Sequence, residues 1–389
     1  MRGHLDRFPL EEDFVQEVAR VLRGGEPSDI GRPALEEKIK GIETGLRDSS
    51  LREDGYFVRK ARWPGGSRLA VCLTHDVDNI SRPSSHLWRT RSRFGFFDVF
   101  GGLLGLVRPY DNVRLIVSNE KERGFRSSFY FLTTNYPLAQ VVNDSNRARS
   151  QGRDIGLHGD FGTHDSVEKM NEAVARFLQG LGFRPSGLRE HYLKFDFEKS
   201  WAVMEQAGFD YDTTVGTNDR LGFRLGLASP FHPPDGSWAP LNLIELPLSL
   251  MDTTLWGYLK RTEEQGMADF LGLLEKVEKV EGLFTLLWHQ EAVRMKGGRI
   301  YWRVLDELKS RGCFVGTGAE VASWWRARAV PLVRDGKLIR LGGEPPNGLT
   351  LRLETTEGTA VRVSSATYQG ESGLRMVTPL GRDFQLEVV

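Results

Sequence analysis

Two aspartates at the end of an apolar run are the residues of this sequence whose type and spacing first suggest chemistry. The run LAVCLTHDVD covers residues 69–78 and ends with His75, Asp76 and Asp78. It predicts a buried strand followed by a polar cluster, and in α/β proteins reactive groups gather at the carboxyl ends of strands. Two carboxylates two positions apart can divide the tasks of holding a cation and accepting a proton. The alternative is a strand end with solvated acids, since aspartate is common in loops.

Histidines are concentrated at predicted strand ends. Of the eight in the chain, five lie at or just after such an end: His75, His158, His164, His191 and His289. A single histidine is more often a packed core or surface group than a functional one. Five at the carboxyl ends of different strands favour a shared site. Two imidazoles with one aspartate would form a three-ligand site for zinc or a similar divalent metal, with positions left open for water and substrate.

The elements that would position these residues alternate between strand and helix. Short apolar runs predict strands at residues 69–74, 127–133, 154–158, 187–192, 211–214, 243–246, 283–288 and 313–316. Helical periodicity between them predicts helices at 113–123, 167–181, 198–207, 268–280 and 301–311. Seven or eight β/α units over about 260 residues are typical of a closed or nearly closed α/β barrel rather than an antiparallel sandwich.

The two ends of the chain have a different pattern. Residues 1–67 have helical periodicity, clearest at 11–22 and 34–46, and predict a helical N-terminal extension. Residues 330–389 alternate between apolar and polar positions with turn residues between the runs, which predicts a small antiparallel β-module. The barrel would then occupy residues 68–329. The β-module could bind sugar, pack on the barrel or mediate dimerisation.

One interval within the barrel is too long for an ordinary loop between a strand and a helix. Residues 79–112 are rich in arginine, tryptophan, phenylalanine and glycine, and they follow the acidic cluster directly. This insertion could cover the mouth of the barrel as a lid or binding wall. It could equally pack on the side of the barrel. A membrane-contacting amphipathic helix is a weaker third interpretation, because the stretch GGLLGL is a poor helix former.

Composition limits the possible partners. The chain has 389 residues, 40% hydrophobic and 27% charged, with 52 basic and 52 acidic side chains that cancel. This balance is typical of a globular protein and offers no whole-chain argument for binding nucleic acid or a membrane surface, although it leaves room for a local patch. The two cysteines, Cys72 and Cys313, predict reduced core residues rather than disulfides. No window predicts a transmembrane segment and the first residues lack the apolar region of a signal peptide, so a cytoplasmic location is expected.

The order of the polar motifs resembles that of the NodB-type polysaccharide deacetylases, the carbohydrate esterase family 4 group. The motifs are THDVD, HGDFGTH, REHY, IELPLSLMD and LLWH, and the resemblance spans residues 68–325. It implies a distorted (β/α)7–8 barrel that uses a bound divalent metal, expected to be zinc, to remove acetyl groups from N-acetylated sugars. By position, it implies that Asp76 is the general base, Asp78 and His158 are metal ligands, Arg189 holds Asp76, and His289 is the general acid. Tyr192 and His75 are assigned to substrate binding.

This sequence departs from the family pattern at three places. The first motif has the variant form D-x-D, and its His75 stands where the family has an aromatic residue. The spacing from His158 to His164 is longer than usual, so either His164 or His191 could be the third ligand. The fourth motif lacks the usual aspartate and tryptophan pairing, which leaves the partner of the acid histidine unassigned.

The expected function is therefore a metal-dependent deacetylase acting on a carbohydrate or glycan precursor. Hydrolysis of a non-sugar C–N bond on the same fold is one alternative, and a non-catalytic glycan-binding protein is another. The presence of Asp76, Arg189 and His289 argues against the binding protein, which needs neither a base nor an acid beside a metal. The oligomeric state is open and includes a homodimer.

Overall fold

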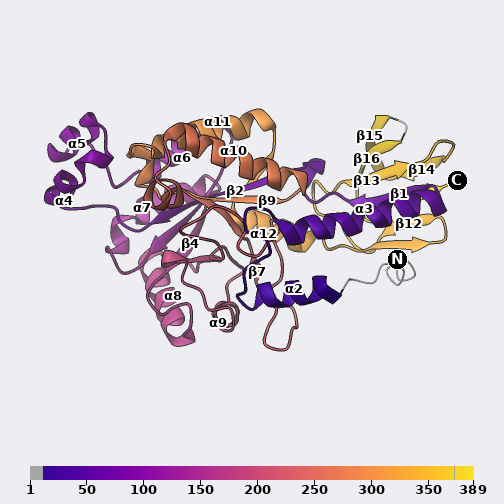
Figure 1. Cartoon of the computed structure of the whole chain (residues 1–389), viewed down its shortest axis with the longest axis horizontal. Coiled ribbons are helices and arrows are strands. Elements are labelled where there is room, and N and C mark those ends of the chain that lie inside the picture. Colours follow the sequence, from indigo (N-terminus) through magenta and orange to yellow (C-terminus); the bar gives the residue numbers. More distant parts are fainter. Residues whose placement is uncertain (1–11, 372) are drawn as a thin grey trace.

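A curled parallel sheet lies at the centre of the computed structural model, which describes residues 12–371 and 373–389 (Figure 1). Its strands run in the order β7-β6-β5-β4-β3-β2-β9-β8, and β10 pairs with the first half of β2. All these pairings are parallel. The strands are β2 (Ala70–Val77), β3 (Ser128–Leu132), β4 (Asp154–Gly159), β5 (Gly187–Glu190), β6 (Tyr211–Asp212), β7 (Ile244–Glu245), β8 (Leu248–Met251), β9 (Leu283–Leu287) and β10 (Phe314–Gly316).

The stretch from β7 to β8 joins the two ends of this strand order. β7 pairs with β6, and β8 pairs with β9 on the opposite side of the sheet. Only Leu246 and Pro247 separate the two strands, so one short stretch curls the sheet into a distorted barrel. The predicted barrel is thereby confirmed. The eight predicted strands are present, and β8 is an additional one.

Helices cover the outside of the sheet with their apolar faces turned inward. In α8, the buried residues Met170, Ala173, Val174, Phe177 and Leu181 recur at helical spacing. This helix begins at a side-chain cap from Ser166 and ends at Gly182, whose φ of 82° suits glycine. The barrel helices are α6 (Val113–Glu122), α7 (Val142–Ser150), α8 (Val167–Leu181), α9 (Ser200–Gln206), α10 (Glu263–Lys279), α11 (Tyr301–Arg311) and α12 (Gly318–Ala327).

The two ends of the chain come together in antiparallel sheets. The N-terminal extension forms α2 (Glu12–Leu22), α3 (Ala34–Asp54) and the strand β1 (Tyr56–Lys60), which had not been predicted; Glu11 lies outside the described residues. β1 pairs with β13 in the sheet β1-β13-β16-β15, and a second sheet has the order β11-β12-β17-β14. The C-terminal strands are β11 (Leu332–Asp335), β12 (Leu338–Leu341), β13 (Leu351–Thr355), β14 (Val361–Ser364), β15 (Ala366–Glu371), β16 (Leu374–Pro379) and β17 (Gln385–Val388).

These antiparallel sheets pack on the end of the barrel where the parallel strands begin. One apolar cluster contains Leu351 and Leu386 of the sheets together with Ala70 and Leu283, the first residues of β2 and β9. In Figure 1 the sheets and the insertion of residues 79–112 therefore lie at opposite ends of the molecule. Within the described residues, no helix is both long and apolar enough to cross a membrane.

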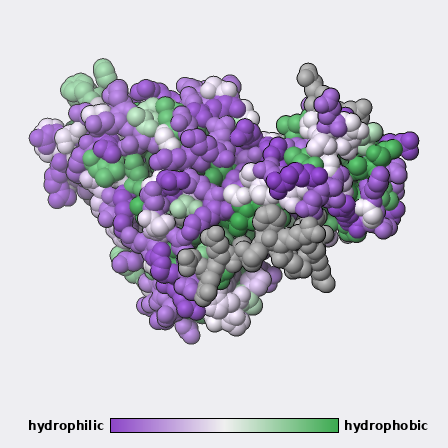
Figure 2. Space-filling model, turned by 45° about the vertical axis from the view of Figure 1, so that its right-hand side comes forward, coloured by the Kyte–Doolittle hydropathy of each residue, from purple (hydrophilic) through white to green (hydrophobic). Residues whose placement is uncertain are grey.

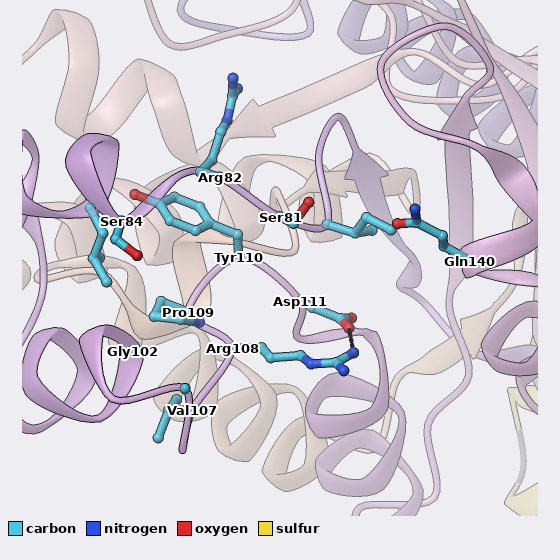
Figure 3. A pocket seen from close by; sticks show the side chains of 13 residues that line it. Ser81, Arg82, Ser84, Gly102, Val107, Arg108, Pro109, Tyr110, Asp111 and Gln140 are labelled. Atoms are coloured by element: carbon cyan, nitrogen blue, oxygen red, sulfur yellow. Dashed lines mark ion pairs between the residues drawn. The ribbon is translucent and has the colours of Figure 1, made fainter.

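The insertion forms two short helices, α4 (Ser84–Arg89) and α5 (Phe96–Leu103), at the carboxyl end of β2. Buried Gln290 fixes both ends of it: its side-chain amide donates to the carbonyls of Asn79 (2.7 Å) and Tyr110 (2.6 Å) and accepts from the backbone of Asn112 (2.7 Å). A cavity of about 580 Å³ lies within the insertion, between Tyr110, Arg108 and Gln140 (Figure 3).

Candidate metal and catalytic site

Polar residues from four different strands meet at the carboxyl end of the barrel. Asp76 and Asp78 lie at the end of β2, and His158 lies in β4. His191 lies in the turn after β5, and His289 is the second residue after β9. Asp78 Oδ1 lies 3.1 Å from His158 Nε2 and 3.9 Å from His191 Nε2, and Asp78 Oδ2 lies 3.9 Å from His289 Nε2. The structure thus brings together five of the residues to which the sequence assigned chemistry.

Asp78, His158 and His191 have the geometry of a metal-binding triad. Among the described residues, they are the group of histidine, cysteine and acidic side chains whose ligand atoms lie within 4.8 Å of one another. His158 Nδ1 lies 2.8 Å from the carbonyl oxygen of Arg189 and must carry the proton, because a carbonyl only accepts. His158 Nε2 is therefore a lone-pair donor, and it is buried without a hydrogen-bond partner within the described part of the chain, as is Asp78 Oδ1. Such donors fit a divalent cation.

The pKa shifts of Asp78 and His191 suit a cation site, whereas the carboxylates of Asp76 and Asp78 raise the pKa of His158 more than burial lowers it. Burial raises the pKa of Asp78, but its contact with His158 and the nearby charges of His289 and His191 lower it more, so that the net pKa lies well below its ordinary value. Burial and the neighbouring His158 lower the pKa of His191. An ionised carboxylate and a neutral imidazole are the forms that bind metal.

His164 and His191 are separated by the structure. His191 faces Asp78, and its ring lies 5.0 Å from that of His158, measured between centroids. His164 does not belong to the triad, and its Nε2 lies 3.9 Å from a carboxylate oxygen of its neighbour Asp165. Of the two alternatives for the third ligand, the geometry favours His191.

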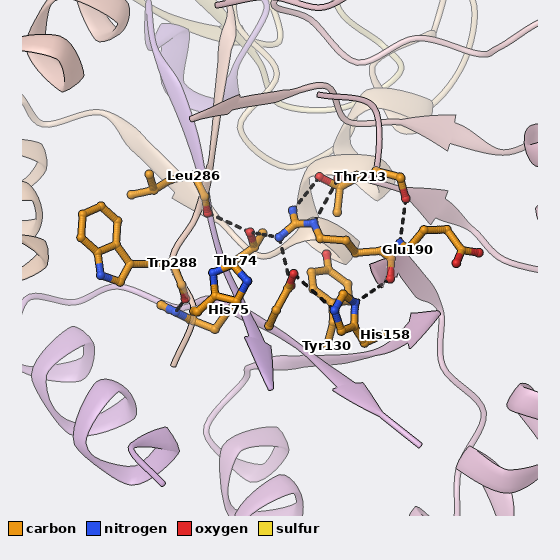
Figure 4. A network of polar contacts seen from close by, with 12 residues as sticks. Thr74, His75, Tyr130, His158, Glu190, Thr213, Leu286 and Trp288 are labelled. Carbon is orange, nitrogen blue, oxygen red and sulfur yellow. Dashed lines mark hydrogen bonds and ion pairs between the residues drawn. The ribbon is translucent and has the colours of Figure 1, made fainter. Parts of the chain in front are cut away.

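Arg189 holds Asp76 through a buried ion pair. Figure 4 shows Thr74, His158 and Thr213 in the network of polar contacts around this pair. The guanidinium of Arg189 has no exposed surface and donates from Nη1 to Asp76 Oδ1 (3.2 Å) and to the hydroxyl of Thr74 (2.7 Å). Thr213 accepts two further hydrogen bonds, at its carbonyl (3.1 Å) and its hydroxyl (3.0 Å). The guanidinium is therefore fixed on three sides, and it fixes one oxygen of Asp76. The second oxygen lies 3.6 Å from His158 Nε2, on the side of the triad.

Asp252 is the partner of His289 that the sequence left unassigned. His289 Nδ1 donates to Asp252 Oδ1 at 2.7 Å, and the backbone N–H of His289 donates to the other oxygen at 3.2 Å. Burial lowers the pKa of His289, but Asp252 raises it more, to about 10. Asp252 is the last residue of the motif IELPLSLMD and follows β8 directly. Its place after a strand was the signal that could have identified it.

His75 lies outside the site, which corrects its assignment to substrate binding. Its side chain has no exposed surface. Nδ1 lies 2.7 Å from the carbonyl of Trp288, and Nε2 lies 2.9 Å from Glu120 and 3.2 Å from the hydroxyl of Tyr301. Successive residues of a strand point to opposite faces. Because Asp76 points into the barrel, His75 points out of it, under the helices.

Aromatic side chains form one rim of the site. Tyr192 is exposed and stacks on His191, with 3.9 Å between ring centroids. Exposed Phe161, which the sequence did not single out, lies 6.0 Å from Tyr192. Tyr192 and Leu193 have φ values of 58° and 51°, a region that non-glycine residues seldom adopt. Consecutive residues in this conformation turn the chain sharply after β5 and are common at functional sites.

Comparison with known proteins supports the fold. No family model matches the chain, and no curated protein matches it. Among solved structures, the "putative polysaccharide deacetylase" of Mycobacterium smegmatis superposes with a TM-score of 0.52 at 18% identity, over 70% of this chain and 96% of that one. The allantoinase Puue has a TM-score of 0.49 at 16% identity, over 70% and 94% of the two chains. A "probable polysaccharide deacetylase" from Pseudomonas aeruginosa PAO1 has a TM-score of 0.48 at 17% identity, over 69% and 94%. From its sheet order, its motif positions and its likeness to the Mycobacterium smegmatis structure, the chain has the NodB-type fold of the polysaccharide deacetylases.

Proposed function

We propose that the chain is a metal-dependent hydrolase that removes an acyl group, in the simplest case acetyl, from the nitrogen of a sugar or glycan precursor. The observation that carries the proposal is that Asp76 and His289 both reach the triad of Asp78, His158 and His191. Asp76 Oδ2 lies 3.6 Å from His158 Nε2, and His289 Nε2 lies 3.9 Å from Asp78 Oδ2. A glycan-binding protein needs no such pair, because neither a base nor an acid contributes to holding a sugar.

The residues of the triad fit a divalent ion, and zinc is the metal that two imidazoles and one carboxylate favour. When bound, such an ion supplies Lewis acidity toward a carbonyl oxygen and toward water. Asp78 and His158 would hold it with buried atoms that have no other partner among the described residues, and His191 would be the third ligand.

Asp76 and His289 would handle the protons of the reaction. Hydrolysis of an amide consumes one water, breaks the C–N bond and yields a carboxylic acid and an amine. Asp76 would accept a proton from the attacking water, and Arg189 keeps its carboxylate in place for that task. His289 would donate a proton to the leaving nitrogen from Nε2, the ring atom that faces the triad, while Asp252 holds Nδ1.

Tyr192 and Phe161 would bind the sugar. Both are exposed beside His191, and the apolar face of a sugar ring can pack on an aromatic side chain at the rim. This keeps Tyr192 as a substrate-binding residue and adds Phe161.

The test combines metal analysis with release of acetate from a panel of N-acetylated mono- and oligosaccharides and one small non-sugar amide. We expect about one divalent ion per chain, lost together with activity in Asp78→Ala and His158→Ala. The matched variants His191→Ala and His164→Ala should differ in metal content: His191→Ala should lose the ion, and His164→Ala should retain it. A native chain that binds no divalent ion after reconstitution would overturn the hydrolase. Turnover of the non-sugar amide alone would support metal-dependent hydrolysis but contradict a sugar as the substrate.

A further inference from the structure

Helix α5 of the insertion has its polar and apolar faces reversed. Asp98 is buried, with 7% of its surface exposed, whereas Phe96 and Phe97, which precede it in the first turn of the same helix, are 75% and 85% exposed. Phe100 stacks on Phe96 in solvent, with 5.9 Å between their centroids and 6° between their planes. A surface helix of a globular protein normally turns its charge outward and its phenylalanines inward. The reversal indicates that the outer face of α5 meets something apolar.

The apolar surface extends beyond α5 to the ends of the insertion. Of the eighteen large apolar side chains that are exposed among the described residues, seven lie here: Trp88, Phe96, Phe97, Phe100, Leu103, Leu104 and Leu106. We call these residues the apolar tip. In Figure 1, α4 and α5 project at the left end of the molecule, and Figure 2 shows green apolar surface at that end. Exposed apolar side chains concentrated in one part of a surface in this way mark an interaction site.

The apolar tip is held firmly in its outward orientation. The buried carboxylate of Asp98 accepts hydrogen bonds from Arg294 (2.9 Å) and Arg299 (2.6 Å), both in the segment that follows β9. Gln290 binds the two ends of the insertion, and the backbone of Lys296 donates to the carbonyl of Arg93 (2.7 Å). Because these bonds preorganise the tip, binding through it would cost little ordering entropy.

Five exposed arginines belong to the same insertion as the apolar tip. Arg82, Arg89, Arg91, Arg93 and Arg108 are all exposed, in a chain whose net charge is zero. The insertion has two acidic residues, and only one of them pairs with an arginine of the insertion. Asp111 lies 3.5 Å from Arg108, whereas buried Asp98 pairs with Arg294 and Arg299, which lie outside the insertion. Within the described residues, Arg82, Arg89, Arg91 and Arg93 form no ion pair with a carboxylate. Arg91 lies over the ring of Trp88, 4.6 Å from its centroid.

We propose that the apolar tip docks on the surface of an anionic phospholipid bilayer, with α5 lying in the interface. Its phenylalanines and leucines would enter the boundary between headgroups and acyl chains, and the arginines of the insertion would contact lipid phosphates. An insertion that combines exposed arginines with exposed aromatic residues suits a bilayer better than the core of a protein–protein interface, where charge is depleted. This inference goes beyond the proposed hydrolase, and its test requires no turnover.

Cosedimentation of the full chain with vesicles tests the proposal. We expect binding to vesicles of phosphatidylcholine with phosphatidylglycerol, weaker binding to phosphatidylcholine alone, and release of the chain by high salt. Phe97→Ser with Phe100→Ser should lower partitioning at least about tenfold, because each phenylalanine contributes burial of an apolar side chain. Arg89→Gln with Arg93→Gln should lower it by about 25-fold at low salt, from roughly fivefold for each charge.

Matched substitutions on the C-terminal sheets serve as controls. Leu380 and Arg382 are exposed there, so Leu380→Ser with Arg382→Gln removes similar chemistry far from the insertion and should leave partitioning unchanged. Circular dichroism and metal content verify that every variant is folded. Equal partitioning into neutral and anionic vesicles, or partitioning that the tip variants do not change, would overturn the proposal. So would a concentration-dependent dimer that Phe97→Ser dissociates in a chain that binds no vesicles, since the tip would then bind a second copy.

Discussion

Two histidine–carboxylate pairs at the carboxyl ends of the neighbouring strands β2 and β9 look alike in isolation. His289 Nδ1 lies 2.7 Å from Asp252, and His75 Nε2 lies 2.9 Å from Glu120. They differ in what the second ring nitrogen meets. In His289 it faces the carboxylate of Asp78 at 3.9 Å, whereas in His75 it lies 2.7 Å from the carbonyl of Trp288.

This difference shows that a carboxylate partner does not by itself make a histidine reactive. His289 is 18% exposed and keeps one ring nitrogen directed at the site. His75 has no exposed surface, and both its ring nitrogens are engaged. The first pair can transfer a proton to a substrate, and the second can only stabilise the packing of α6 and α11 on the sheet. Substitutions in the two pairs should therefore have opposite signatures.

The largest effect is expected at His289. Replacement by alanine should lower kcat by about 10²–10⁴-fold, the usual contribution of a positioned general acid, with the metal retained. Steady-state kinetics on the substrate identified by acetate release, together with metal analysis, measure both quantities. Retention of full activity in His289→Ala would contradict this role and indicate that another group is the general acid.

A smaller effect with a pH signature is expected at Asp252. Asp252→Asn should lower kcat by about 10–100-fold, as is usual for a group that orients a site residue. The carboxylate raises the pKa of His289 to about 10. Without it the pKa falls, so the protonated acid is lost at lower pH and the alkaline decline of kcat moves toward neutrality. An unshifted pH profile in the variant would contradict the pairing.

The smallest effect on activity, and a clear effect on stability, is expected at His75. His75→Leu leaves Glu120 buried without one of its partners and should lower the free energy of unfolding by about 1–3 kcal/mol, with kcat of the folded chain unchanged. Urea unfolding measures this loss. The double variant with Glu120→Leu should lose less stability than the sum of the two single variants, because the contact between His75 and Glu120 is then lost only once. A fall in kcat without loss of stability would show that His75 contributes to the reaction and would contradict its purely structural role.

Much of the architecture could be predicted from local pattern. The runs at residues 69–74 and 283–288 are apolar except for Thr74 and Thr285, because both faces of those strands are buried. The periodicity at residues 167–181 matches the buried stripe of α8. β1 was missed because its partner β13 is about 300 residues away, and nothing local in YFVRK indicates that pairing. β8 was missed because it continues the same apolar stretch as β7.

The site residues also fall into those that the sequence indicated and those that required the structure. The residue types and their places at strand ends indicated Asp76, Asp78, His158 and His289, since parallel strands bring their carboxyl ends to one edge. The resemblance to the NodB-type family added Arg189 and the roles of all five. The choice between His164 and His191, the pairing of Asp252 with His289, and the burial of His75 depend on side-chain direction. Direction follows from the pleat and from the turn at Tyr192 and Leu193, which no spacing in the sequence expresses.

By itself, the sequence determined the barrel, the order of its polar motifs and the set of residues able to do chemistry, because these follow from periodicity and residue type along the chain. Only the tertiary structure decided which histidines face the same space and which way α5 turns its phenylalanines. Both depend on contacts between residues distant in sequence, such as Asp98 with Arg294 and Asp252 with His289. The free energy of such contacts depends on burial and geometry that arise only when the chain has folded.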